Sequence, residues 1–454
     1  MVETYRHEIV SRIVSFILPL TFLLLSLIRF SFFPYPEILT EIYFRNQGML
    51  PYQQINDQHF PGMMLLPLNL STLGISSVDG LRIFHLVLVI INFLILNKLT
   101  RYFSNPIRLI GLSLFAIFFI TWEGHILWID SVVATLSLIG FYLLHTRSKS
   151  YLLTGLVFGL ILLFKQPGIL LCGIAAIWIL TTKPKVKSFL VFVIGGVLPM
   201  GLASMYLYSI GVWNDFWFWT VVHNLTGYTF LEGRQPLLSE QIRLMILWIP
   251  GLLAATRIKQ DWLYGLYILA ASIFLFPRFG LIHAQVVLPI LVFLITQWLA
   301  NNSKFIVLGL ILVVMGLGLW YRSARRESAG KVYFYDSSIQ ATLDFVETTA
   351  DKNKSIYVFG VNDNIYHLTQ TLPPTKHWVE LLRGNISYSV EDFLIKTLKN
   401  DPPQFILVDP LAIQDGILVR NFAPRVWDYI ITNYQINLNL ANGINVWYPK
   451  NETN

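Results

Sequence analysis

Residues 10–33, VSRIVSFILPLTFLLLSLIRFSFF, decide the fold, and the polar loop that follows them, residues 34–61, reads PYPEILTEIYFRNQGMLPYQQINDQHFP. The apolar stretch is long enough to cross a bilayer core, which takes about 20 residues of helix. It runs into aromatic, Pro-rich sequence and lacks a small-residue cleavage site. We therefore interpret it as a spanning helix and not as a cleavable signal peptide.

The whole chain has the composition of a membrane protein. Of its 454 residues, 55% are hydrophobic and 13% are charged, and the mean hydropathy is +0.58. Soluble domains carry about 25% charged residues, so a single water-soluble domain is excluded. The single cysteine, Cys172, excludes an intrachain disulfide and a Cys-based metal site. In such a chain the net charge of +7 reports membrane orientation and predicts no nucleic-acid partner.

Eleven segments have the character of membrane spans, which predicts a mostly α, polytopic transmembrane helical bundle. Their limits are 10–33, 80–97, 107–121, 126–144, 150–164, 167–182, 188–210, 242–256, 261–277, 281–300 and 304–321. If the N-terminus is cytoplasmic, thirteen basic residues fall on the inner side, as the positive-inside rule requires. They are Arg6, Arg12, Lys98, Arg101, Arg108, Arg147, Lys149, Lys183, Lys185, Lys187, Arg257, Lys259 and Lys304. Loops 34–79 and 211–241 and the C-terminal residues then lie outside, and the low cysteine content favours a prokaryotic cell membrane.

We predict that residues 322–454 form a small outer α/β domain, which follows a transmembrane domain of residues 1–321. Charge rises there, and short apolar runs suit buried strands. The predicted strands are Ser355–Gly360, Gln404–Asp409 and Gly443–Tyr448, and the predicted helices are Ile339–Thr349 and Val390–Lys399. Ser389 is the predicted N-cap of the second helix.

The first outer loop carries ionisable residues close to a span. Its pattern predicts one interfacial helix over Glu37–Gln47, ended by Gly48, and a second helix from Pro61 through Leu66. The loop therefore presents four ionisable side chains near the outer surface: Glu37, Glu41, Asp57 and His59. A solvated loop with capping carboxylates explains any one of them. A carboxylate just after a span and a second one 20 residues later form a more specific pattern.

Other polar residues interrupt the apolar pattern on the same side of the membrane. Glu123 lies in the short link between the third and fourth spans. Asp130, about one turn into the fourth span, has to face the bundle, in a structural or a functional role. Lys165 and Gln166 follow the fifth span, where Lys165 either reaches the headgroup region or binds a lipid phosphate.

Three more residues complete the candidates. Arg278 can bind a phosphate through a forked pair of hydrogen bonds. His283, just inside the next span, is either a satisfied bundle residue or part of the same site. Arg234 follows an aromatic segment, residues 213–219, which suits an interfacial belt or covers a lipid substrate. The sequence has no GxxxxGK[ST], HExxH or CxxC motif, so no soluble-enzyme class competes.

Together these residues resemble the GT-C class of polytopic glycosyltransferases, in the style of the protein O-mannosyltransferases and the aminoarabinose transferases of lipid A. The resemblance covers the whole chain, from the short N-terminal arm through the long first loop to the C-terminal domain. The matching motifs are Glu37 after the first span, Gly48-x-x-Pro51-Tyr52, Asp57-x-His59, Lys165-Gln166, and Arg278 ahead of His283 and Pro289.

The resemblance implies an inverting transfer of a sugar from a polyprenyl-phosphate-linked donor to an acceptor hydroxyl on the outer face. Glu37 would be the base, with Asp57 as the alternative, and Arg278 with Lys165 or Arg234 would stabilise the phosphate that leaves. The other expected substrate contacts are Glu41, His59, Glu123, Gln166 and His283. The implied partners are a polyprenyl-phosphate sugar, membrane lipids and an acceptor glycan, lipid or protein. A divalent metal is compatible with the Glu and His residues, but their spacing fits no recognisable metal site.

Two other functions are compatible with a polytopic chain. A lipid or polysaccharide transporter needs polar residues through the bilayer midplane, whereas here they gather at the outer rim. A non-catalytic membrane scaffold would use its outer domain to bind a partner. It stays open because a single acidic residue, Glu37, stands where the GT-C family often has a pair.

Overall fold

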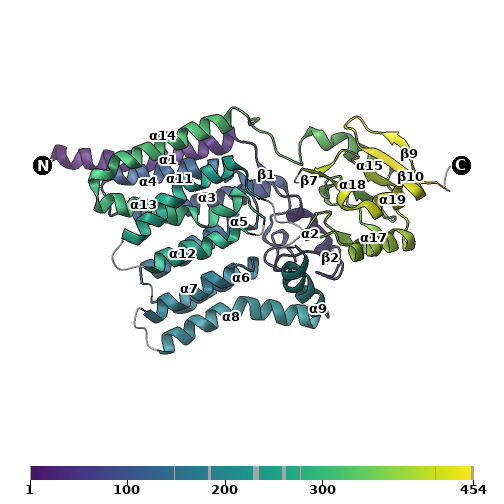
Figure 1. Cartoon of the computed structure of the whole chain (residues 1–454), viewed down its shortest axis with the longest axis horizontal. Coiled ribbons are helices and arrows are strands. Elements are labelled where there is room, and N and C mark those ends of the chain that lie inside the picture. Colours follow the sequence, from purple (N-terminus) through teal and green to yellow (C-terminus); the bar gives the residue numbers. More distant parts are fainter. Residues whose placement is uncertain are drawn as a thin grey trace. The chain divides into compact units, whose positions relative to one another are not determined.

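The computed structural model describes residues 2–147, 149–181, 186–228, 235–257, 262–276, 278–414 and 416–450. The chain forms two compact units, and Figure 1 colours the chain along its sequence. The first unit comprises Met1–Pro34, Asp79–Leu202 and Gln235–Val332. The second unit comprises Tyr35–Val78, Ala203–Arg234 and Tyr333–Asn454, so segments predicted as outer loops cluster with the C-terminal residues.

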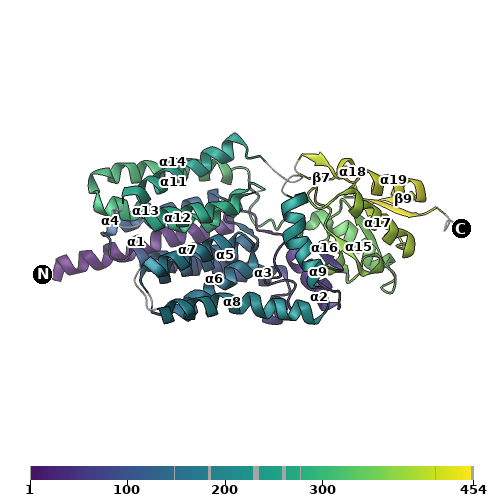
Figure 2. The ribbon, with the colours of Figure 1, turned by 60° about the horizontal axis from the view of Figure 1, so that its bottom comes forward.

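The first unit is a bundle of apolar helices that run side by side (Figure 2), and each predicted span corresponds to a helix. Among the described residues, five helices are long and apolar enough to cross a membrane: α1 (Val2–Arg29), α3 (Val78–Thr100), α8 (Val186–Ser209), α11 (Leu238–Arg257) and α14 (Ile306–Ala324). The shorter apolar helices are α4 (Asn105–Thr121), α5 (Ile129–His145), α6 (Tyr151–Phe164), α7 (Gly168–Thr181), α12 (Trp262–Ser272) and α13 (Leu288–Asn301). Short 3₁₀ turns lie between the last helices of this unit. η3 (Ile273–Leu275) and η4 (Leu281–Val286) lie between α12 and α13, and η5 (Ser303–Phe305) lies between α13 and α14. The predicted mostly α bundle is confirmed.

The core of the first unit is built around α4, which packs against α1, α13 and α14. Small residues allow these close approaches: a Cβ atom on Gly111 would lie 2.3 Å from the Thr296 hydroxyl of α13. The outer faces of the bundle are apolar as well, with Ile28 71% exposed and Val314 67% exposed. Large exposed apolar faces are typical of a surface that meets lipid.

A two-stranded sheet belongs to the first unit. β1 (Phe33–Pro34) pairs in parallel with β3 (Ile126–Leu127), with Phe33 opposite Ile126. The pairing fixes the end of the first span against the link between α4 and α5.

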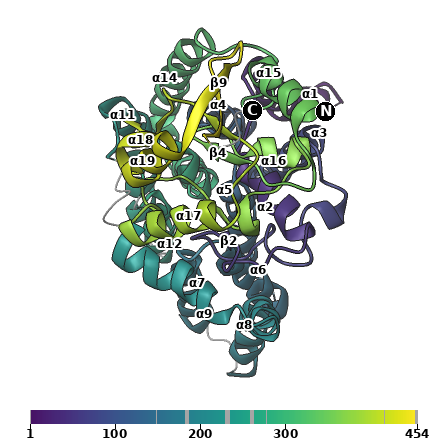
Figure 3. The same ribbon diagram turned by 90° about the vertical axis from the view of Figure 1, so that its right-hand side faces the viewer.

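The second unit is built on a four-stranded sheet in the order β4 (Tyr357–Phe359), β6 (Ile406–Val408), β10 (Asn445–Pro449) and β9 (Tyr434–Asn439). β4 and β6 are parallel, and β10 is antiparallel to both of its neighbours. The accompanying helices, several of them visible in Figure 3, are α15 (Gln340–Thr349), α16 (Asn364–Thr369), α17 (Tyr388–Asn400), α18 (Val419–Phe422) and α19 (Pro424–Asn433). A small hairpin, β7 (Ile413–Gln414) and β8 (Ile417–Leu418), precedes α18. The three predicted strands and two predicted helices are confirmed, and β7, β8 and β9 are additions.

Shorter elements of the second unit precede this sheet in the sequence. They are α2 (Glu37–Asn46), β2 (Ile55–Asn56), η1 (Ser71–Leu73), α9 (Trp213–Trp217) and the π-helical η2 (Phe218–Tyr228). The second unit also contains the 3₁₀ turns η6 (Ser337–Ile339), before β4, and η7 (Pro374–Lys376), after β4, and strand β5 (Trp378–Val379). The predicted helix from Glu37 is confirmed, and Gly48 follows it at φ +82°, a conformation that favours glycine.

Two local predictions are wrong. Residues 61–66 form turns and not a helix, because Pro67 disfavours helical geometry in the residue before it and has no N–H to donate. Ser387, not Ser389, caps α17. The Ser387 backbone is extended and its hydroxyl accepts from the Val390 N–H at 3.4 Å, so that Ser389 is already helical.

Candidate functional site

Helix α2 begins the acidic part of the second unit. Pro36 precedes the helix, and its ring holds φ at −60°, which is already a helical backbone angle. Glu37 is the first helical residue. Glu41 lies one turn later on the same face of the helix. The Glu41 side chain is 3% exposed, and its Oε2 has no hydrogen-bond partner among the described residues. Two ionised carboxylates four residues apart would repel each other, which favours a proton on one of them.

A short pair of parallel strands adds two more carboxylates. β2 pairs with β5, with Ile55 opposite Trp378 and Asn56 opposite Val379. Asp57 and Glu380 are the next residues after the two strands, so the pairing brings them to the same end. Asp57 is 4% exposed, and its Oδ2 has no hydrogen-bond partner in the described part of the chain.

A fifth carboxylate, Asp363, lies in the turn between β4 and α16. Sequence reasoning missed both Asp363 and Glu380. A signal existed for Asp363, because a buried strand, Gly360 and a polar run precede a helix there. Glu380 had no local signal, since its position depends on strand pairing with a segment far away in the sequence. We call the five residues the carboxylate cluster: Glu37, Glu41, Asp57, Asp363 and Glu380.

The members of the carboxylate cluster alter one another's protonation. Burial, and then the charges of its neighbours beginning with Asp57, raises the pKa of Glu41 well above its usual range. Burial and the adjacent Glu37 likewise raise the pKa of Glu380. Burial and the charge of Glu37 raise the pKa of Asp363 to about 8. The cluster therefore retains protons at neutral pH.

The loop around Asp57 is fixed by hydrogen bonds. Asp57 Oδ1 accepts from the His59 backbone N–H at 3.0 Å and lies 2.7 Å from His59 Nδ1. The Tyr52 hydroxyl donates to the His59 carbonyl at 3.0 Å. The Asn224 amide of η2 donates to the Gln58 carbonyl at 2.8 Å. Asp57 thus orients an imidazole, an arrangement that can hold or move a proton.

The His, Cys, Asp and Glu side chains are the candidate ligands for a metal ion. Within the described ranges, no group of three or more His, Cys, Asp or Glu residues is placed to hold a metal ion. A divalent metal stays a prediction from the sequence.

A second polar group lies in the first unit, at the start of α5. Asp130 is fully buried, and both of its carboxylate oxygens accept from Lys165 Nζ at 2.8 Å. His283 Nδ1 lies 2.8 Å from Asp130 Oδ2 and 3.3 Å from Lys165 Nζ. Asp130 therefore faces the bundle, as a carboxylate in a span has to. We call these three residues the Asp130 triad.

The remaining candidates lie in links between helices of the first unit. Arg278 is partly exposed and close enough to His283 for their charges to interact. Gln166 is partly buried between α6 and α7. Glu123 follows α4 at φ +62°, next to Gly124, where a Cβ atom would lie 2.3 Å from the Phe119 carbonyl. Arg234 lies outside the described residues.

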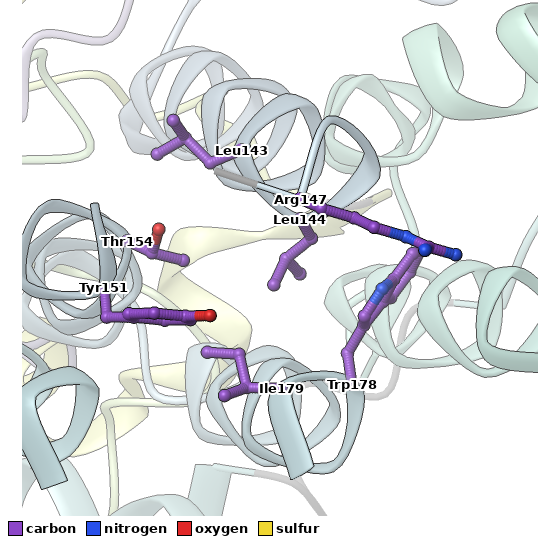
Figure 4. Close-up of a pocket in the computed structure, with 7 residues that line it drawn as sticks. All are labelled: Leu143, Leu144, Arg147, Tyr151, Thr154, Trp178 and Ile179. Atoms are coloured by element: carbon purple, nitrogen blue, oxygen red, sulfur yellow. The ribbon is translucent and has the colours of Figure 1, made fainter. Parts of the chain in front are cut away.

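Two of the pockets are lined by residues that belong to neither group. One, in the first unit, has a volume of 30 Å³, enough for about one water molecule (Figure 4). Its lining residues are Leu143, Leu144, Arg147, Tyr151, Thr154, Trp178 and Ile179. The other, in the second unit, is an open hollow of 520 Å³. It is lined by Trp213, Asn214, Trp217, Phe218 and Val222.

Comparison with solved structures identifies the fold, although no protein-family model and no curated protein sequence matches the chain. ArnT from Cupriavidus metallidurans bound to undecaprenyl phosphate matches with a TM-score of 0.59 and 12% identity, over 96% of this chain and 97% of that one. Its apo structure matches with a TM-score of 0.61 over the same shares and at the same identity. A mutant of the mycobacterial arabinofuranosyltransferase AftD matches at 0.53 and 12% identity, over 98% of this chain and 41% of that one.

This chain has the GT-C fold. The resemblance inferred from the sequence motifs is confirmed at the level of fold, because ArnT and AftD are both GT-C membrane glycosyltransferases. The GT-C fold and the apolar helices make the chain an integral membrane protein. The side of the membrane that each terminus faces stays a prediction.

Proposed function

We propose that this chain is a membrane glycosyltransferase that moves a sugar from a polyprenyl-phosphate-linked donor to an acceptor hydroxyl, with inversion at the sugar carbon. The observation that carries the proposal is the carboxylate cluster, which begins directly after the first span of a GT-C fold. The solved relative ArnT holds undecaprenyl phosphate, which supports a donor of the same chemical class. The acceptor is a glycan, a lipid or a protein at the outer face.

Glu37 is the proposed base. Its carboxylate takes the proton of the acceptor hydroxyl while the acceptor oxygen attacks C1 of the sugar from the side opposite the phosphate. A positioned base typically contributes about 10²–10⁴-fold to the rate. Asp57 is the alternative base, because it too is buried and pairs with His59. Glu41 completes the proposed acidic surroundings of the acceptor.

The leaving group is a phosphate anion, so it needs positive charge and not a general acid. Arg278 is the proposed main phosphate ligand, because a guanidinium can donate two parallel hydrogen bonds to phosphate. Lys165 is a weaker candidate, since Asp130 already accepts from its ammonium group on both oxygens. His283 supports Arg278 in this proposal, and Glu123, Gln166 and Arg234 remain proposed substrate contacts.

Isosteric variants test which carboxylate is the base. The full chain, purified in detergent, is given donor and acceptor, and release of polyprenyl phosphate is followed for wild type, Glu37→Gln and Asp57→Asn. Glu37→Gln is expected to lose about 10²-fold or more in turnover, and Asp57→Asn to lose less. Glu391→Gln is a matched control, because Glu391 is buried in the same unit and accepts hydrogen bonds from backbone N–H groups of α19. Full turnover in both Glu37→Gln and Asp57→Asn would exclude a base at either position.

A further inference from the structure

Glu380 has a position that depends only on strand pairing. The β2–β5 register carries it to the end of the strand pair at which Asp57 also lies, and its carboxyl is within hydrogen-bonding reach of Glu37. Across the described residues, no N–H or O–H group is found donating to Glu37 Oε2, which is buried. Two carboxyl groups at hydrogen-bonding distance cannot both be ionised without strong repulsion, so they share a proton.

Two buried tyrosine hydroxyls independently indicate that a ligand with hydrogen-bonding groups is missing beside the carboxylate cluster. Tyr357 is 8% exposed, and its hydroxyl has no partner in the described part of the structure although Asp363 lies near it. The Tyr335 hydroxyl is likewise buried without a described partner, close to the charge of Glu37. Buried polar groups without partners cost free energy, which a bound ligand with hydroxyl groups would recover.

We propose that Glu380 is a positioning residue that keeps one proton and donates it in a hydrogen bond to Glu37. Glu37 is then held as a carboxylate in a fixed orientation, and it receives the proton of the acceptor hydroxyl when the new C1–O bond forms. The electron pair of the breaking C1–O bond leaves with the phosphate. Glu380 keeps its own proton throughout, so the step balances without any further reactant.

Several titratable groups face this pair from the neighbouring elements. Glu41 belongs to α2, Asp57 follows β2, and Asp363 precedes α16, which packs on α2. Tyr335 and Tyr357 are the nearby phenols. All the neighbouring acids are negative when ionised, so each of them favours retention of the proton between Glu37 and Glu380.

The kinetic part of the test rests on the proposed function. In wild type, loss of the shared proton at alkaline pH should lower kcat/KM, because the two carboxylates then repel each other. Glu380→Gln keeps an N–H donor at every pH, so its profile should lose that alkaline fall. Glu380→Ala leaves Glu37 without its donor and should lower kcat/KM about 10²-fold at all pH values. A Glu380→Gln profile with the wild-type shape would overturn the proposal, and Glu391→Gln should keep the wild-type profile.

An infrared measurement tests the shared proton without any transferase activity. The carboxylic-acid C=O band of the detergent-solubilised full chain is recorded at neutral pH for wild type, Glu380→Gln and Glu391→Gln. The proposal predicts that Glu380→Gln loses one protonated-carboxyl band that remains in Glu391→Gln. An unchanged band in Glu380→Gln would overturn the proposal, even if the chain proves to be a transferase. A lost band in a chain without transferase activity would keep the shared proton and refute only the function.

Discussion

At the scale of single residues, the buried ion pair between Asp130 and Lys165 should be the most sensitive point of the first unit. Removing one partner of a buried pair leaves an uncompensated charge, at a cost of about 3–5 kcal/mol. Asp130→Asn and Lys165→Met should therefore each lower the unfolding temperature in detergent strongly. The double variant, which leaves neither charge, should recover most of the loss. Strictly additive losses in thermal unfolding would show that the two side chains do not depend on each other.

A second residue-scale prediction concerns Asp363 and pH. Burial and the charge of Glu37 raise the pKa of Asp363 from 3.8 to about 8, so the folded chain holds a proton that the unfolded chain has lost. The stability from that proton is complete below pH 3.8 and is lost as the pH rises to about 8. Asp363→Asn should therefore reduce the fall in unfolding temperature between pH 5 and pH 8.

The matched control for that measurement is Asp344→Asn, because Asp344 is exposed on α15. It should keep the wild-type dependence on pH. Equal pH dependence in wild type and Asp363→Asn would show that Asp363 is not protonated in the folded state.

Three of the five residues of the carboxylate cluster could be predicted from the sequence. Glu37, Glu41 and Asp57 are visible because they follow an apolar span and sit in one short loop. Glu380 was not, because its place depends on a two-residue parallel pairing that leaves no periodic signal. The pairing of Lys165 with Asp130 was equally hidden, since two residues on different helices meet only when the helices pack.

At the scale of elements, glycines set how closely α6 and α8 approach. A Cβ atom on Gly155 of α6 would lie 2.0 Å from the Phe192 carbonyl oxygen of α8. Gly155→Ala should therefore separate the two helices and lower stability by about 1–3 kcal/mol. Gly173→Ala in α7 is the control, because its Cβ would meet no atom within 4 Å. The control should be neutral or slightly stabilising in thermal unfolding, and equal effects of both changes would contradict this packing.

Helices could largely be predicted from the sequence where a long apolar segment forms them. Each of the apolar segments forms a helix, since a chain in lipid has to satisfy its backbone internally. The helix predicted over residues 61–66 failed because Pro67 outweighed the apolar pattern. Strand β9 was missed because most of its residues are exposed and carry no buried run.

At the scale of the whole molecule, the charge pattern predicts the orientation in the membrane. Single cysteines introduced into a Cys172→Ser background report which side each segment faces. Asn353→Cys, in the exposed link between α15 and β4, should react with a membrane-impermeant maleimide on intact cells. Tyr102→Cys, at a position 78% exposed between α3 and α4, should react only after the membrane is opened. The reverse pattern would invert the proposed topology.

The central claim is that this GT-C fold transfers a sugar from a polyprenyl phosphate. The most direct measurement supplies the purified wild-type chain with a panel of polyprenyl-phosphate sugars and a membrane extract as acceptor source. We expect free polyprenyl phosphate and a new glycoside to appear together in equal amounts, and we expect Glu37→Gln to abolish both. Release that is the same in Glu37→Gln, or no release from any donor of the panel, would contradict it.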